Sequence, residues 1–242
     1  LLTESLYDET PLKKLIEKIV TKEFLREVAA AHATGRRLYI ATTNLDGGEL
    51  VVWDMGKIAT GNRADPVLMF QKILRASAAV PGLFPPVYIK PVKGKELRQA
   101  HVDGGVKAPV LIRNFMFETP APKRNLYVVI NGSLNRLNAA DAVEANLADI
   151  GKKSITEIMR SLMDTTIYQG YVAARNSNTD FRLVAIPDEV KPSAEALDFN
   201  NAKMRELFEI GRKVWQQPDP WLKEPPRLER FERVGAPVLA KG

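Results

Sequence analysis

Apolar residues recur every three or four positions in several segments, which is the pattern of helices with one buried face. Proline stands at the predicted starts of two of them, Pro11 and Pro66, where its missing amide hydrogen costs nothing. Asp65 is the predicted N-cap of the second, and Gly35 is placed to end an earlier helix. The apolar stripes are Leu12, Leu15, Ile16 and Ile19; Phe24, Leu25 and Val28; Val67, Phe70, Ile73 and Leu74; Ile155, Ile158, Met159, Leu162, Met163 and Thr166; and Met204, Leu207, Phe208, Gly211, Val214 and Trp215.

Short β-branched or alternating runs lie between these helices and predict strands. A turn at residues 44–48 joins the first two as a hairpin, and residues 81–91 are predicted to form a proline-broken loop. Because strands alternate with helices, we expect an α/β fold with a partly parallel central sheet flanked by helices. The predicted strands are Leu38–Thr43, Glu49–Asp54, Arg98–Val102, Leu126–Ile130 and Phe181–Ile186.

The length of 242 residues favours one domain, which we place at residues 1–217. The prolines of Pro218-Asp219-Pro220 and Glu224-Pro225-Pro226 predict an irregular tail over residues 218–242. No apolar run approaches the roughly 18 residues that a membrane span needs. The first four residues lack both the basic start and the apolar stretch of a signal peptide.

Composition excludes several kinds of chemistry. The chain has no cysteine, which excludes disulfides and thiolate nucleophiles. With only two histidines, His32 and His101, we expect neither a Ser-His-Asp triad nor a metal site, and no cofactor is predicted. The formal charge of +6 is compatible with nucleic acid or an anionic membrane surface. Its cations are interleaved with acids, which favours a solvated surface; no nucleic-acid motif occurs, and peripheral membrane contact stays open.

The sequence Asp103-Gly104-Gly105 follows a predicted strand and allows two interpretations. A carboxylate at the carboxyl end of a strand lies where open α/β sheets bind ligands, and the glycines allow close backbone approach or positive φ. Alternatively, Asp-Gly is a common hairpin turn. His101 lies on the same strand face as Asp103 by period-two geometry, and a structural role is favoured for it over orienting the carboxylate.

A serine nucleophile at a strand-to-helix elbow needs the pattern G-x-S-x-G, and the sequence does not contain it. Gly132-Ser133 follows a strand, but Leu134 and Asn135 come next, where the pattern requires a second glycine. Ser133 is therefore predicted to be a loop residue. Ser77 stands among small residues that favour close packing, and a packing role is predicted for it. No nucleophile is therefore assigned in these residues.

Three segments, in this order, resemble the patatin-like phospholipases: Thr42–Glu49, Ala76–Pro86 and Val102–Gly105. The helix at Met204–Gly211 is similar to a C-terminal feature of the family, so the resemblance spans about residues 11–215. It implies an α/β sandwich that hydrolyses lipid acyl esters with a Ser-Asp dyad and no histidine. Asp103, Gly104 and Gly105 match the D-G-[GA] motif, whose aspartate is the implied general base.

The same resemblance implies a G-x-S-x-G serine and a glycine-rich oxyanion loop, both preceding the helix at Pro11, and neither is present. We therefore expect a patatin-like domain that is incomplete on its N-terminal side and inactive alone. The alternative is a non-catalytic lipid- or protein-binding module on the same fold. Lipids or acyl esters are the expected substrates, and Phe84 and Tyr88 are expected to line the acyl channel.

Overall fold

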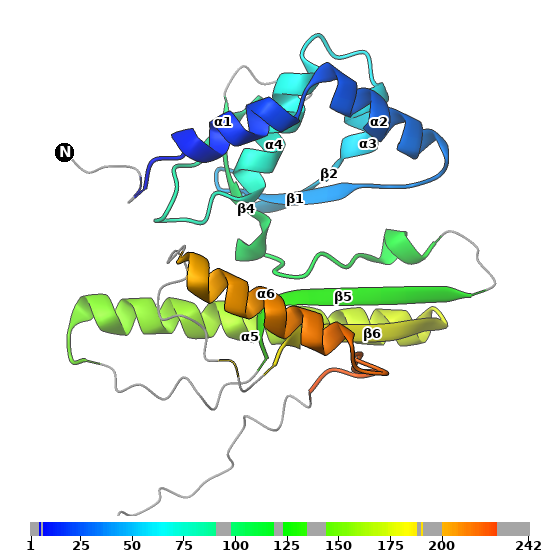
Figure 1. Ribbon diagram of the computed structural model, residues 1–242. Helices are drawn as coiled ribbons and strands as arrows, with labels where there is room; N and C mark the ends of the chain where they lie inside the picture. The colour runs from blue at the N-terminus through cyan, green and yellow to red at the C-terminus, as the bar shows by residue number, and fades with distance from the viewer. Residues whose placement is uncertain are drawn as a thin grey trace, which may run out of the picture. The chain divides into compact units, whose positions relative to one another are not determined.

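The computed structural model describes residues 5, 7–90, 98–118, 123–134, 144–187, 190 and 200–226, without the side chains of 147–149 and 152. The chain divides into two compact units, Leu1–Leu111 and Ile112–Gly242. Each is described by itself (Figure 1).

The first unit contains a four-stranded sheet in the order β2-β1-β4-β3. All three pairs of neighbouring strands are antiparallel, and Thr42 of β1 lies opposite Asp103 of β4. The predicted hairpin is confirmed, since the turn that begins at Asn44 joins β1 to β2 with Gly48 at φ +62°. The strands are β1 (Tyr39–Asn44), β2 (Glu49–Asp54), β3 (Val87–Ile89) and β4 (Gln99–Asp103).

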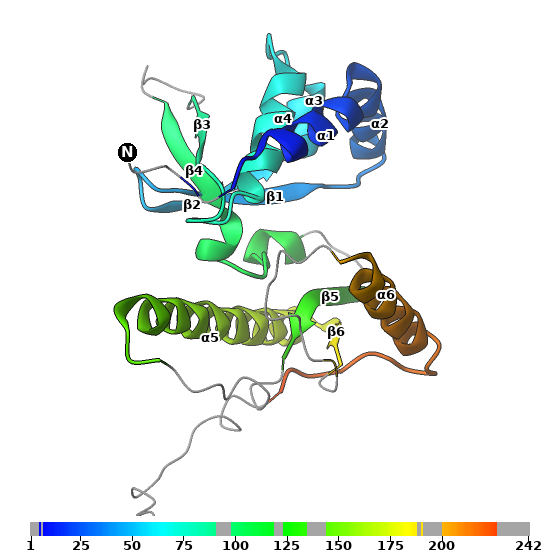
Figure 2. The same ribbon diagram turned by 60° about the vertical axis from the view of Figure 1, so that its left-hand side comes forward.

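Four helices lie on one side of this sheet (Figures 1 and 2). The fourth helix packs against β1, β3 and β4, and its fully buried Phe70 and Ile73 are central to the hydrophobic core. The first two helices are separate elements because the chain breaks at Thr21, whose hydroxyl caps the second by accepting from the Phe24 N–H at 3.3 Å. The helices are α1 (Thr10–Ile19), α2 (Lys22–Ala33), α3 (Met55–Thr60) and α4 (Pro66–Ser77).

Two local expectations for this unit need correction. Asp65 occupies the N-cap position of α4, but its side chain makes no capping hydrogen bond and instead lies 3.5 Å from the Arg63 guanidinium. Residues 81–91 are not wholly a loop, because Val87–Ile89 form β3. The preceding prolines do not prevent this, since β3 is an edge strand and begins directly after Pro86.

The second unit contains a parallel pair of strands joined as β5-α5-β6, and both strands were predicted from their apolar runs. Helices α5 and α6 cover opposite faces of the pair (Figures 1 and 2). The expected irregular tail forms one backbone bridge, because Leu222 exchanges two hydrogen bonds with Leu183 of β6. Residues 227–242 of that tail lie outside the described residues. The remaining elements are η1 (Gly104–Val106), η2 (Asn114–Phe117), β5 (Arg124–Ser133), α5 (Leu147–Asn176), β6 (Thr179–Ile186) and α6 (Asn201–Trp215).

The expected α/β class is confirmed, but the parallel pairing is confined to β5 and β6. The strand that carries Asp103 has only antiparallel partners in the described sheet. The expectation that ligands bind at the carboxyl ends of parallel strands therefore does not apply to Asp103. A single domain over residues 1–217 stays a prediction. Among the described residues, no helix is long and apolar enough to cross a membrane.

Candidate active site around Asp103

Asp103 ends β4 and is held by hydrogen bonds on three sides. Its amide N–H donates to the carbonyl of Ala79 at 3.0 Å, just beyond the end of α4. Its own carbonyl accepts from the Thr43 hydroxyl of β1 at 3.0 Å. The carboxylate Oδ1 accepts from the Gly105 N–H at 2.7 Å. The position of this side chain is therefore fixed by the sheet, by the turn after α4 and by its own following residue.

Gly104 is needed for space rather than for backbone conformation, and Gly105 is under a much weaker constraint. A Cβ at Gly104 would lie 2.6 Å from the carbonyl oxygen of Ala41, and one at Gly105 would lie 3.1 Å from Asp103 Oδ1. Neither glycine has positive φ, whereas a type I′ hairpin turn needs positive φ at both central residues. The chain continues into η1 rather than into a returning strand, so the hairpin interpretation is wrong.

Burial raises the pKa of the Asp103 carboxyl, and the hydrogen bond from Gly105 opposes this. Among the described residues, no lysine, arginine or histidine nitrogen lies within 4.0 Å of the carboxylate. The charged form is therefore disfavoured by desolvation without a neighbouring cation to offset it. A carboxylate in this state is a stronger base than an exposed aspartate.

These residues fall inside a segment that is similar to a known family. Residues 1–116 match the patatin-like phospholipase family. The resemblance is thereby confirmed over residues 1–116, and the assignment of Asp103, Gly104 and Gly105 to the family motif stays a prediction. The matched segment ends at Met116, so the expected similarity of Met204–Gly211 lies outside it. No curated protein matches the chain.

The patatin-like phospholipases that these 116 residues resemble act in general as acyl hydrolases on lipids. Catalytic residues for this chain are not given by the match, so the role of each residue stays a prediction. Within the described residues, no cluster of three histidine, aspartate or glutamate side chains forms a metal site.

In the patatin-like segment, His101 belongs to a buried polar network rather than to Asp103. Its Nδ1 lies 2.9 Å from the Thr42 hydroxyl, which also accepts from the Trp53 indole N–H at 2.8 Å. The Thr42 hydroxyl therefore links the Trp53 indole to the His101 imidazole within the buried network. Burial lowers the pKa of His101, and Asp46 opposes this, so the favoured structural role fits its surroundings.

Two of the small residues before Pro81 pack closely, whereas Ser77 is only half-buried and its packing role stays a prediction. Ala76 and Ala79 are almost fully buried, and the Ala79 carbonyl is the one that holds the Asp103 N–H. The sequence identifies this run as a packing segment, but it does not show which strand the run meets. Together with Thr43, Ala79 is a positioning residue that sequence reasoning missed.

The proposed acyl-channel residues lie on two different elements. Phe84 is in the turn after α4, where its amide donates to the Val80 carbonyl at 3.0 Å and its ring centroid lies 6.2 Å from that of Tyr7. Tyr88 is the outward residue of β3 and is 44% exposed between buried neighbours. Their role in an acyl channel stays a prediction.

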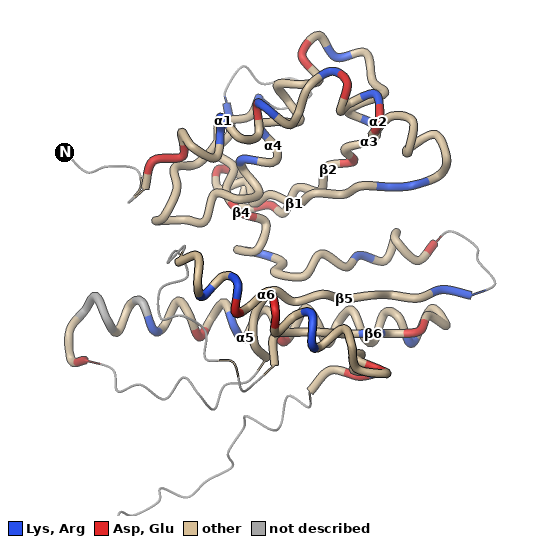
Figure 3. The backbone as a smooth tube through the Cα atoms, viewed as in Figure 1, with Lys and Arg blue, Asp and Glu red and all other residues tan. Residues whose placement is uncertain are grey.

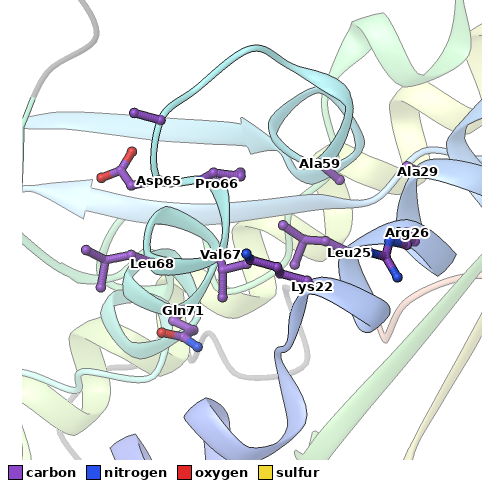
Figure 4. Close-up of a pocket in the computed structure, with 11 residues that line it drawn as sticks. Lys22, Leu25, Arg26, Ala29, Ala59, Asp65, Pro66, Val67, Leu68 and Gln71 are labelled. Atoms are coloured by element: carbon purple, nitrogen blue, oxygen red, sulfur yellow. The ribbon is translucent and has the colours of Figure 1, made fainter.

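A groove of about 490 Å³ lies in the first unit between α2, α3 and the start of α4 (Figure 4). A second, of about 340 Å³, lies in the other unit between α6 and the ends of β5 and β6. Asp103, Phe84 and Tyr88 line neither of them. The first is lined by Lys22, Leu25, Arg26, Ala29, Ala59, Ala64, Asp65, Pro66, Val67, Leu68 and Gln71.

Proposed function

We propose that this chain carries the general-base part of a patatin-like lipid acyl hydrolase, with Asp103 as the proton acceptor of a Ser-Asp dyad. The proposal rests on the hydrogen bonding and the burial of this carboxylate. Its Oδ1 is held by Gly105, while Oδ2 accepts no hydrogen bond within the described residues. Burial also raises its pKa, which suits a base that takes a proton from an alcohol.

In the proposed reaction, Asp103 accepts the hydroxyl proton of a serine as the serine oxygen bonds to the acyl carbonyl carbon. The ester C–O bond then breaks, and the leaving alcohol takes the proton from Asp103. Water hydrolyses the resulting acyl-enzyme by the same proton transfer. Because the 242 residues contain no G-x-S-x-G, the serine must be supplied by polypeptide outside them.

Without the serine and the oxyanion loop, the rate of ester hydrolysis should be greatly reduced. General-base assistance contributes roughly 10²–10⁴ to the rate, and one oxyanion-hole donor contributes roughly 10²–10³. A general base without a nucleophile has no proton to accept. We therefore propose that these 242 residues alone do not hydrolyse esters.

The test uses the natural polypeptide that joins a G-x-S-x-G segment to this chain, assayed on p-nitrophenyl acyl esters. Asp103→Asn should lower kcat by roughly 10²–10⁴ while the circular dichroism spectrum is unchanged. Asp65→Asn is the matched control, since its side chain is half exposed and makes no capping bond. Full activity of Asp103→Asn would refute the assignment of the base.

The second candidate is a non-catalytic lipid- or protein-binding module. Two observations favour it: the sequence lacks G-x-S-x-G, and the groove of about 490 Å³ is not lined by Asp103. The flanking sequence of the gene separates the two candidates. An upstream G-x-S-x-G in the same reading frame supports the hydrolase, and a start codon at this point supports the module.

A further inference from the structure

The outer side of α1 combines a row of lysines with a row of exposed aliphatic side chains. Lys14 and Lys18 are four residues apart on the helix, as are Leu15 and Ile19, so each pair lies along one face. Lys22 begins α2 directly after the break. We call these five residues the α1 face; its cations are visible along α1 in Figure 3.

The aliphatic members of this face are exposed to solvent. Leu15 and Ile19 are each 53% exposed, and no residue of α1 is fully buried. The packing side of the helix adjoins this face, since Ile16, three residues before Ile19, contacts the hydrophobic core. Leu15 and Ile19 therefore leave about half of their surface in water.

The charge around these side chains is positive. Within the described residues, no carboxylate lies within 4.0 Å of the Lys14, Lys18 or Lys22 ammonium groups. Most acidic groups nearby have other partners: Glu17 pairs with Lys13, Glu23 with Arg26, and Glu9 with Arg75. Asp8, hydrogen-bonded to Thr10, also has its pKa lowered by Lys14, and Glu27 lies on α2. Residues 10–26 hold five cations and two acids.

We propose that the α1 face is a docking surface for an anionic lipid bilayer. Its charge is complementary to phosphatidylserine-type headgroups, and aliphatic side chains beside lysines suit insertion at the level of those headgroups. Pairing with a second copy is disfavoured, because the same lysines would meet across a twofold interface. A ten-residue helix face is also small compared with the roughly 800 Å² per partner of a standard protein interface.

The expected loss of vesicle affinity can be estimated from the number of lysines replaced. Each basic residue near an anionic surface raises affinity by about fivefold, so replacing three should lower it by about a hundredfold. Salt should weaken binding, because the screening length is only about 10 Å at about 0.1 M ionic strength. Removing the two aliphatic side chains should lower affinity by roughly tenfold or more.

The experiment measures co-sedimentation of the full chain with phosphatidylcholine vesicles, with and without phosphatidylserine. The lysine variant is Lys14→Gln/Lys18→Gln/Lys22→Gln, and the aliphatic variant is Leu15→Ser/Ile19→Ser. The matched control alters α6, which also exposes a large apolar side chain among cations: Arg205→Gln/Phe208→Ser/Lys213→Gln. Circular dichroism checks that each variant is folded.

We expect the parent and the α6 variant to bind phosphatidylserine vesicles, and both α1-face variants to bind them much more weakly. The proposal is overturned if the parent does not bind, if it binds pure phosphatidylcholine equally well, or if the α6 variant loses as much affinity as the α1-face variants. Vesicle binding requires no hydrolysis, so these outcomes are independent of the role proposed for Asp103.

Discussion

The sharpest test of the site's architecture is a comparison of Gly104→Ala with Gly105→Ala. An alanine methyl at position 104 would lie 2.6 Å from the carbonyl oxygen and 2.7 Å from the carbonyl carbon of Ala41. Favourable carbon contacts are about 3.5–4.0 Å long, so the methyl is roughly 1 Å too close to backbone that cannot rotate away. At position 105 the nearest atom, 3.1 Å away, is Oδ1 of the Asp103 side chain.

These distances predict very different losses in the free energy of unfolding for the two variants. To admit a methyl at position 104, η1 must move away from β1 immediately after the point where Thr42 pairs with Asp103. Overpacking costs about 1–3 kcal/mol where side chains can adjust, and we expect at least about 3 kcal/mol here because only backbone can move. At position 105 a small rotation of the carboxylate suffices, so the expected cost is below about 1 kcal/mol.

The assay is urea unfolding combined with amide hydrogen exchange. Hydrogen exchange reports on β1 and β4 separately from the other unit. Tryptophan fluorescence would not do so, because two of the three tryptophans lie outside this sheet. Faster exchange at the Asp103 amide is expected in Gly104→Ala but not in Gly105→Ala. Gly132→Ala is the control, since its Cβ would meet only an ordinary contact at 3.9 Å. Equal losses of stability at positions 104 and 105 would refute the reasoning.

Two further outcomes are expected. Burial raises the pKa of Asp103 above its ordinary 3.8. The stability that its protonated carboxyl contributes is therefore complete below that value and is lost as pH rises through the raised pKa. Urea unfolding from about pH 3 to about pH 7 should show Asp103→Asn gaining stability relative to the parent as pH rises. If Phe84 lines an acyl channel, Phe84→Ala in an active polypeptide should shift the preferred ester chain length by roughly tenfold in kcat/KM, and an unchanged profile from short to long esters would remove that role.

Local chemistry made several elements predictable from the sequence. The turn at Asn44 forms because its Oδ1 accepts from the Asp46 and Gly47 amides and because Gly48 supplies a positive φ. Gly35 adopts the positive φ expected after a helix. The break at Thr21 was not predicted, although the Thr21 hydroxyl that caps α2 is a local signal. Each of these depends on residues that are neighbours in the chain.

Features that depend on distant neighbours were not predictable in the same way. Strand order is one of them: nothing local to β4 indicates that β1 and β3 lie beside it in antiparallel directions. The helix α3 was missed because six residues are too few to show periodicity, although Asp54 caps it by accepting from the Lys57 amide. The hydrogen bond from Asp103 to Ala79 likewise joins residues 24 positions apart.

The choice of a carboxyl group at position 103 is not explained by stability. Its one side-chain hydrogen bond is accepted from the Gly105 N–H, and an asparagine carbonyl oxygen would accept the same bond. The carboxylate adds a desolvation cost that no cation in the described residues offsets. A buried amide would avoid that cost, whereas only a carboxylate can accept a proton at neutral pH. The glycines after it leave β1 and η1 in close contact while keeping that group in place. Stability alone therefore does not select aspartate at this position, which agrees with the proposal that Asp103 is a proton acceptor.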